Sequence, residues 1–258
     1  MSEFELVVGV DQTGAKVSGG GAKPLPTAIM IKSKKGWKLL VPLMLKSFNK
    51  KNIESLLCEF KLTVDWSAIL IVADCVLGLP EKIVGSKDPL TILRSSMSKA
   101  SVFEGVGLKA GESFFLTCFP NALEKDDSCL VRRTEKNLGC LSVFKNKPFQ
   151  KNVQTGTYRI WSDLGKEKEY LNFNIWPYEK GSGRAYLCEG YPAHAKEVVK
   201  KLACAKIENF HLYQEVSKDH KDAAALAVLG ALFFDSAKNI KYKKEGRILT
   251  AADYKGVD

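Results

Sequence analysis

The feature that most constrains the fold is an uninterrupted apolar run, Ser67–Ala73, which stops abruptly at Asp74. A run in which apolar residues do not alternate with polar ones predicts a strand that is covered on both faces. Such a strand lies inside a sheet, with helices packed above and below it. We therefore expect a sheet with Asp74 at the end of its central strand.

Three further strands are predicted before this run. Phe4–Val10 is apolar and rich in β-branched residues, and it stops at Asp11. Thr27–Ile31 and Gly36–Leu45 are strand-like stretches joined by the basic turn Lys32–Gly36. Their spacing predicts a hairpin beside the first strand.

The rest of the chain combines helical spacing with one more strand. Arg184–Cys188 predicts a short strand that ends at Glu189. Apolar residues recur at helical spacing in Asn52–Lys61, Pro89–Ala100, Thr157–Leu164, Ala193–Ala205 and Lys218–Phe234. This order predicts an α/β fold, a mixed sheet flanked by helices, in one domain over residues 1–258. Residues 81–183 are predicted to form a long insertion or lid after the fourth strand, because Gly and Pro interrupt the pattern there.

Composition excludes several classes of protein. The 258 residues are 45% hydrophobic and 26% charged, ordinary values for a globular chain, which excludes intrinsic disorder. No apolar run approaches the roughly 18 residues of a membrane span, and the first residues lack a signal-peptide layout. We therefore expect a cytoplasmic protein without membrane contact. The seven cysteines form no Cys-x-x-Cys pair, which argues against zinc and redox motifs and fits a reducing compartment.

The formal net charge of +10 indicates a polyanionic partner, and nucleic acid is the partner we expect. Several cations stand beside aromatic residues, an arrangement that suits phosphate contacts and base stacking. The expected nucleic-acid contacts are Lys34, Lys35, Trp37, Arg132 and Arg133. A solvated basic surface is the alternative interpretation of any one of these clusters.

Acidic residues recur at the ends of predicted elements. Asp11, Asp74 and Glu189 each follow or end a strand, and Asp219 and Asp222 lie in the first turn of the last helix. Each acid alone has a local explanation, as a turn former or a helix cap. In open sheets, however, ligands gather at the carboxyl ends of strands. Carboxylates that meet at one point repel each other unless a divalent cation neutralises them.

We therefore predict a carboxylate cluster that binds Mg²⁺ or Mn²⁺. The expected metal ligands are Asp11, Asp74, Asp222, Glu189 and Asp219. Two such ions about 4 Å apart would clamp the attacking and leaving oxygens of a phosphodiester. The expected catalytic residues are Asp11, Asp74, Glu189 and Asp222, with Glu189 as a fourth ligand or as a base for the attacking water.

Four short motifs carry a resemblance to a known family: Gly9–Asp11, Ala73–Pro80, Glu189–Pro192 and Asp219–Ala223. In this order they resemble the domain-of-unknown-function family of predicted nucleases with a ribonuclease H-like fold. The last motif also resembles the final metal-binding helix of RuvC-type resolvases. The resemblance implies a ribonuclease H-like fold and a metal-dependent nuclease. One departure is Val76, where many members carry proline; it changes the local backbone but leaves the preceding aspartate in place.

Two other functions remain as alternatives to a divalent-metal-dependent nuclease. An actin-like small-molecule kinase needs a second phosphate motif, and the best candidate, Gln154–Thr157, follows no strand-end acid. A phosphate loop is absent, because Gly9–Val17 lacks the Gly-Lys-Ser/Thr ending. A non-catalytic nucleic-acid-binding relative would keep the fold and the charge without binding a metal.

Overall fold

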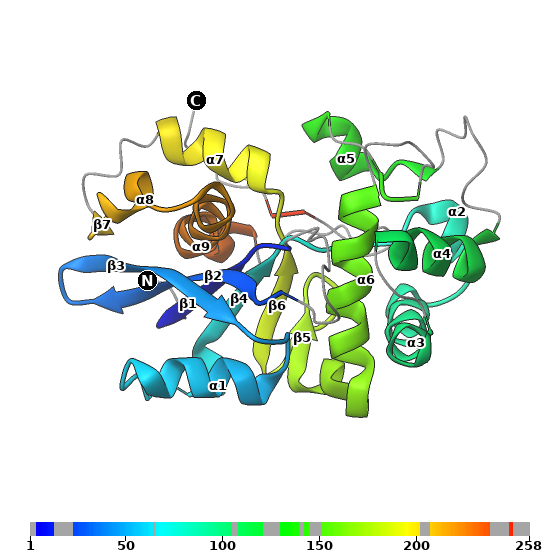
Figure 1. The fold of residues 1–258 in the computed structure, drawn as a ribbon, viewed down its shortest axis with the longest axis horizontal. Helices are drawn as coiled ribbons and strands as arrows, with labels where there is room; N and C mark the ends of the chain where they lie inside the picture. The colour runs from blue at the N-terminus through cyan, green and yellow to red at the C-terminus, as the bar shows by residue number, and fades with distance from the viewer. Residues whose placement is uncertain are drawn as a thin grey trace.

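The computed structural model describes residues 4–12, 23–63, 65–104, 108–120, 130–139, 142–144, 151–201, 207–237 and 248–249. Within these residues, seven strands form one mixed sheet with the order β5-β6-β4-β1-β2-β3-β7. Helices flank the sheet on both faces (Figure 1). The predicted α/β class is therefore confirmed.

The sheet has an antiparallel half and a parallel half. β1 pairs antiparallel with β2, and β2 with β3, which gives the predicted hairpin. On its other side β1 pairs parallel with β4, which pairs parallel with β6. β5 and β7 extend the two edges in parallel to β6 and β3. The strands are β1 (Leu6–Val10), β2 (Leu25–Ser33), β3 (Gly36–Leu45), β4 (Ile69–Ala73), β5 (Phe173–Ile175), β6 (Ala185–Glu189) and β7 (Ile207–Glu208).

β4 is the central strand that the apolar run predicted. All five of its residues are buried, and it lies between β1 and β6. The apolar run is longer than the strand because a 3-10 turn, Trp66–Ala68, precedes it. Asp74 follows β4 directly, so the prediction of a strand-end acid here is also confirmed.

On one face the sheet is covered by α7 (Pro192–Lys201), α8 (Leu212–Glu215) and α9 (Lys218–Ala237). The helix α9 approaches β1 very closely, because Gly9 has no side chain. A Cβ on Gly9 would lie 2.0 Å from the Ala223 carbonyl oxygen, so no larger residue fits there. This close approach places the first turn of α9 beside the carboxyl end of β1.

The other face is covered by α1 (Lys50–Glu59) and by a helical segment between β4 and β6. The helices of this segment are α2 (Glu81–Val84), α3 (Pro89–Val102), α4 (Leu108–Cys118), α5 (Arg133–Leu138) and α6 (Lys151–Gly165). A 3-10 stretch, Lys166–Asn172, leads from α6 to β5.

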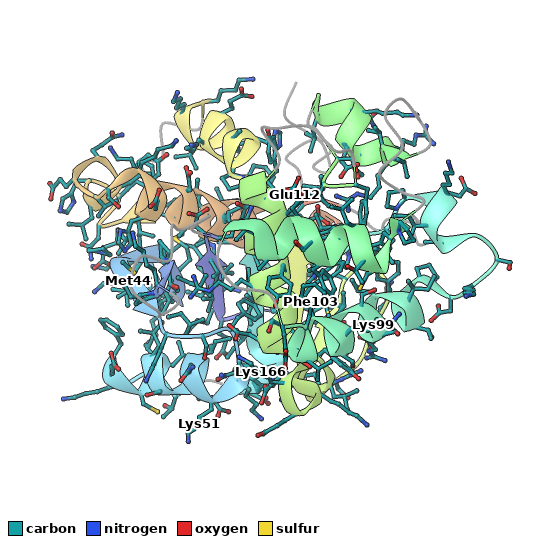
Figure 2. All side chains as sticks on the ribbon, turned by 45° about the vertical axis from the view of Figure 1, so that its right-hand side comes forward. Met44, Lys51, Lys99, Phe103, Glu112 and Lys166 are labelled. Atoms are coloured by element: carbon teal, nitrogen blue, oxygen red, sulfur yellow. The ribbon has the colours of Figure 1, made fainter. Side chains whose placement is uncertain are left out.

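This helical segment shares a hydrophobic core with the sheet. Phe114 and Trp161 belong to the same buried cluster as Leu6 in β1. Phe103, visible between the helices in Figure 2, closes the cluster, with its ring centroid 5.5 Å from that of Phe114. The segment predicted as an insertion over 81–183 therefore packs on the sheet and also supplies its edge strand β5.

α6 is longer than predicted. The sequence indicated a short helix from Thr157, whereas the helix begins at Lys151 and passes through Gly156. Glycine usually weakens the interior of a helix. At position 156 a larger residue would collide with the side chain of Gln12, which lies against the helix there. Among the described residues, no helix is long and apolar enough to cross a membrane.

Candidate active site

Asp11 and Asp74 lie side by side at the carboxyl edge of the sheet. Val10 and Ala73 are partners in the parallel register of β1 and β4, so the next residue of each strand is an aspartate. The Asp74 N–H donates to the Val10 carbonyl at 2.9 Å, which continues the ladder one step past the strand ends. The two acids are therefore held by backbone hydrogen bonds at neighbouring positions.

Both aspartates face the helix α9. Side chains alternate between the two faces along a strand. Val10 and Ala73 point into the core on the α6 side, so Asp11 and Asp74 point toward α9. Asp222, the fifth residue of α9, acts electrostatically on both. Three of the predicted acids, from two strands and one helix, thus lie within electrostatic range of one another.

This convergence raises the pKa of both strand-end aspartates. For Asp11 burial is the largest cause, followed by the charges of Asp74, Asp222 and Asp219, while Lys196 opposes the rise. For Asp74 burial is again the largest cause, and the charges of Glu189 and Asp222 add to it, while hydrogen bonds with Gln12 and Asp11 oppose the rise. A raised pKa means that the cluster holds protons at pH values where isolated carboxylates are ionised. The charge that burial and crowding disfavour could equally be neutralised by a cation.

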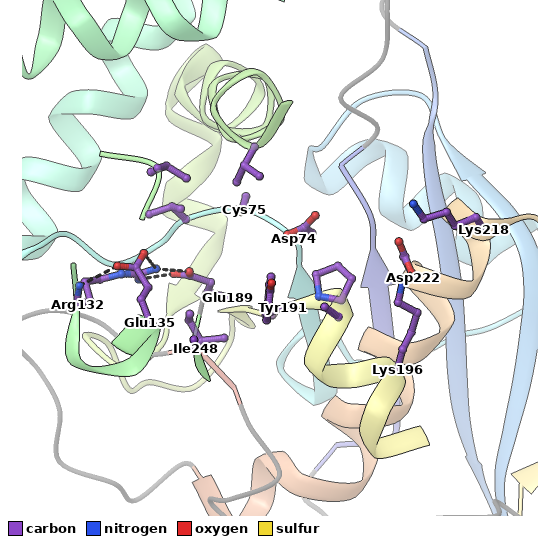
Figure 3. A pocket seen from close by; sticks show the side chains of 17 residues that line it. Asp74, Cys75, Arg132, Glu135, Glu189, Tyr191, Lys196, Lys218, Asp222 and Ile248 are labelled. Atoms are coloured by element: carbon purple, nitrogen blue, oxygen red, sulfur yellow. Dashed lines mark hydrogen bonds and ion pairs between the residues drawn. The ribbon is translucent and has the colours of Figure 1, made fainter. Parts of the chain in front are cut away.

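A pocket of about 480 Å³ opens beside this cluster. It is lined by side chains of both signs, among them Asp74, Asp222, Lys196 and Lys218. Figure 3 shows the two lysines approaching Asp222 from α7 and α9. Lys196 makes an ion pair with Asp222, with its Nζ 2.5 Å from Oδ1. Positive charge thus lies next to the carboxylates inside the pocket.

Glu189 faces the opposite side of the sheet. It is the register partner of Ala73, so its side chain points toward α5 and α6 and away from α9. Its Oε2 accepts from Arg132 Nη1 at 2.7 Å and from the N–H groups of Leu77 and Gly78 at 2.9 and 3.2 Å. Its Oε1 accepts from Arg132 Nη2 at 2.5 Å. Glu189 therefore has its hydrogen-bonding capacity committed to protein donors, and in this state it offers no oxygen to a cation.

Arg132 is a buried structural residue. Its side chain is 1% exposed, and the guanidinium lies between Glu189 and Glu135 (Figure 3). Burial alone would lower the pKa of Arg132, but the two carboxylates raise it well above its ordinary value. Arg132 lines the pocket, but its guanidinium is committed to Glu135 and Glu189, so its contact with nucleic acid stays a prediction. Arg133, the next residue, is exposed at the start of α5.

The loop after Asp74 is held through its backbone. Glu189 binds the N–H groups of Leu77 and Gly78, as described above. On the α6 side, Thr157 Oγ1 accepts from the Val76 N–H at 3.3 Å, and Trp161 Nε1 donates to the Val76 carbonyl at 2.7 Å. These contacts fix the residues that follow Asp74, and so fix the position from which Asp74 projects.

Gln12 joins α6 to the carboxylate cluster. Its side chain is 8% exposed and donates a hydrogen bond to Asp74. Its Oε1 is buried and has no hydrogen-bond partner in the part of the chain that the structure describes. A Cβ on Gly156 would lie 1.6 Å from this oxygen, so the glycine makes the position of Gln12 possible. A buried oxygen without a donor is an unusual feature, and here it lies beside the acids.

The predicted hairpin contacts lie at the other end of the sheet. Thr27, which pairs with Val10, is seven residues before Lys34 in the turn. At the usual rise of a strand this is a separation of about 23 Å. Lys35 is exposed beside Lys34, whereas Trp37 is half-buried against the core. These three residues therefore do not surround the carboxylate cluster, contrary to the expected basic approach to it.

The donors at the cluster are of the type that Mg²⁺ and Mn²⁺ prefer. They are carboxylate oxygens, with the amide oxygen of Gln12 nearby. Within the described ranges, however, no three Cys, His, Asp or Glu side chains lie close enough together to hold a metal ion. Asp222 is instead paired with Lys196.

Sequence reasoning missed Lys196 and Gln12. Lys196 lies four residues after Pro192 in α7, and nothing in the local pattern distinguishes it from the other lysines of that helix. Gln12 does stand next to Asp11, and this adjacency was the one available signal. Comparison of the chain with protein-family models, with curated proteins and with solved structures found no match.

Proposed function

We propose that this protein is a divalent-metal-dependent nuclease with a ribonuclease H-like fold. The observation that carries the proposal is the meeting of Asp11, Asp74 and Asp222 at one edge of the sheet, with the pKa of both strand-end acids raised. Carboxylates crowded in this way are a liability for stability unless they serve a ligand. Their arrangement beside a pocket that also contains lysines fits a phosphodiester substrate.

The fold part of the proposal is supported by topology. The antiparallel meander β1-β2-β3 is extended on the far side of β1 by the parallel strands β4 and β6. The three clustered acids come from β1, β4 and the final described helix, α9, in the same order as the motifs that resemble the nuclease family.

Asp11, Asp74 and Asp222 are the residues that would hold Mg²⁺ or Mn²⁺. A divalent cation bound there supplies positive charge against the developing negative charge of the phosphodiester. Asp219 lies exposed in the same turn of α9 and adds negative charge at the edge of the cluster. Lys196 and Lys218 supply positive charge for the substrate phosphate from the wall of the pocket.

Glu189 has a different role in this proposal. Because Arg132 and two backbone N–H groups occupy its oxygens, we remove it from the ligand set and from the role of base. It acts instead as the residue that holds the loop after Asp74 in place.

The test is cleavage of labelled single-stranded and duplex DNA and RNA with Mg²⁺ or Mn²⁺. Asp11→Asn and Asp222→Asn should each reduce cleavage by at least about a hundredfold, because each removes a charged ligand. Asp65→Asn is the matched control, since Asp65 caps a 3-10 turn that starts at Trp66 and asparagine caps equally well. It should cleave like the wild-type protein.

Other outcomes would overturn the proposal in distinct ways. Salt-sensitive binding of nucleic acid without cleavage, unchanged in Asp11→Asn, would indicate a non-catalytic nucleic-acid-binding protein. Saturable transfer of phosphate from ATP to a small molecule would instead indicate the kinase alternative.

A further inference from the structure

We propose that Lys196 is a displaceable counterion of the carboxylate cluster. In the state described here its ammonium occupies the place beside Asp222 that a divalent cation takes, and the ammonium released by the cation then binds the phosphate of the substrate. The inference rests on the proposed function and adds to it a specific residue that exchanges between two anionic partners.

The first support is the placement of the ammonium. Lys196 reaches from α7 to Asp222 on α9, with 2.5 Å between Nζ and Oδ1. Its side chain is 28% exposed and that of Asp222 is 13% exposed, so the pair lies inside the pocket and not on the open surface. The charge of Lys196 also acts on Asp11, where it opposes the rise in pKa. The ammonium is therefore a counterion of both Asp222 and Asp11.

The second support is that a divalent cation and this ammonium exclude each other. A cation bound to carboxylate oxygens lies about 2.0 to 2.6 Å from them. An ammonium at hydrogen-bond distance from the same Oδ1 would then lie within a few ångströms of the cation, where like charges repel strongly. One of the two must leave, and the doubly charged ion interacts more strongly with several carboxylates than a single ammonium does.

The third support is that the released ammonium has somewhere to go. Lysine carries its charge on a flexible four-carbon stem, so it can change partners without movement of the helix backbone. Lys196 lines the pocket of about 480 Å³, as does Lys218 at the start of α9. A phosphate held in this pocket would meet both ammonium groups next to the cluster.

A titration with Mn²⁺ tests the competition. Removal of the ammonium in Lys196→Met should tighten Mn²⁺ binding about tenfold, as measured by calorimetry on the full chain, because the cation no longer displaces a charge. Lys200→Met is the matched control: Lys200 lies one turn further along α7, is exposed, and carries the same charge. It should change the affinity less than about twofold. Unchanged or weaker Mn²⁺ binding by Lys196→Met would overturn the inference.

Amine acylation of the wild-type protein tests the displacement without any substitution. A short pulse of an N-hydroxysuccinimidyl acetate, read by peptide mass spectrometry, should modify Lys196 about fivefold faster when Mg²⁺ is present, because a paired ammonium is protected. The rate at Lys200 should stay constant. Further addition of inorganic phosphate should slow the reaction at Lys196 again, because the ammonium then has a new anionic partner.

The outcomes separate this inference from the proposed function. Cation binding without faster acylation of Lys196 would overturn the inference alone. Faster acylation that phosphate does not reverse would overturn its phosphate half. Absence of Mn²⁺ binding to the wild-type protein and to Lys196→Met would overturn the inference together with the proposed metal site.

Discussion

Two groups of acidic residues lie at the same edge of this sheet, and they differ in what surrounds them. On the α9 side, Asp11, Asp74 and Asp222 act electrostatically on one another, and Lys196 offsets part of their charge. On the α6 side, Glu189 is enclosed by an arginine and by backbone N–H groups. Figure 3 shows Asp222 and Lys196 on one side of Asp74, and Glu189 with Arg132 on the other.

The difference arises from one step in the register. Ala73 and Glu189 are partners and share a face, whereas Asp74 comes one residue later and points the other way. The group on the α6 side is neutralised and stabilises the fold. The group on the α9 side is incompletely neutralised, which leaves it able to bind a ligand. Similar side chains at one edge thus serve structure or chemistry according to the face on which they lie.

The largest effect is expected on the structural side. Arg132→Met leaves Glu135 and Glu189 buried without their cation, which should lower the free energy of unfolding by about 3 to 5 kcal/mol. Urea denaturation measures this loss. Lys136→Met is the control, since Lys136 is exposed in the same helix, and its effect should stay below about 0.5 kcal/mol. Equal effects of the two variants would contradict the distinction drawn between the two groups.

An opposite and smaller effect is expected on the α9 side. Above its raised pKa of about 9, Asp11 is a crowded charge that Asp11→Asn removes, so at such a pH the metal-free protein should become more stable by about 1 to 2 kcal/mol. The same variant should lose the stabilisation that Mg²⁺ gives to the wild-type protein, as a thermal melt with and without Mg²⁺ would measure. Asp65→Asn should show neither change. A destabilised Asp11→Asn protein would indicate that this aspartate, like Glu189, serves the fold.

A substitution at Gly156 tests whether Gln12, which lies against α6, positions Asp74 on the α9 side of the sheet. Gly156→Ala puts a methyl group where the Gln12 oxygen lies, so the hydrogen bond from Gln12 to Asp74 should be lost. Cation affinity should fall about tenfold, the lower limit for loss of a residue that orients a ligand. Gln12→Leu should give the same fall. Gly181→Ala, where the nearest atom is 3.3 Å away, serves as the control. Normal affinity in both variants would show that Gln12 does not position Asp74.

The most gradual expected effect is a pH dependence of stability. The pKa of Asp11 and of Asp74 is raised in the folded protein, so between the ordinary value of about 4 and the raised value the folded state holds more protons than the unfolded state. The stability that this provides is complete below about pH 4 and is lost as the pH rises. The metal-free protein should lose about 1 kcal/mol per pH unit where the slope is steepest.

Urea titrations at a series of pH values measure this slope. Asp11→Asn should flatten it, and Asp65→Asn should not. A stability that rises over the same range would mean that the aspartates are stabilised as anions, and the two groups of acids would then be alike.

The sheet could be predicted from the sequence because β1 and β4 are apolar runs that end abruptly at an acidic residue. The unbroken run before Asp74 and the abrupt stop at Asp11 locate two strand ends, and adjacent parallel strands bring those ends together. The face on which an acid lies depends on the register between strands, which is a tertiary property. Glu189 was therefore grouped with the aspartates, although it points to the other face.

The basic residues were predicted less well for a similar reason. A cluster such as Lys34 and Lys35 is visible in the chain, but its distance from a site depends on strand direction and pairing. The arginine at position 132 could be recognised as a buried residue only from its two partners, one of them 57 residues away. The position of Asp219 in the first turn of α9 was predicted correctly, because the start of a helix is determined by residues close together in the chain.

The contacts that hold the loop after Asp74 have a consequence for sequence divergence. Every one of them ends on a main-chain atom of residues 76–78, so an apolar substitution that preserves the core packing of Val76 and Leu77 should leave the aspartate in place. Proline at position 76 would stiffen the chain by its ring, but it has no N–H to give to Thr157. This chain instead holds valine there by a hydrogen bond. Val76→Pro should therefore make the Thr157 hydroxyl dispensable, and Thr157→Val should destabilise the wild-type protein more than it destabilises the Val76→Pro variant.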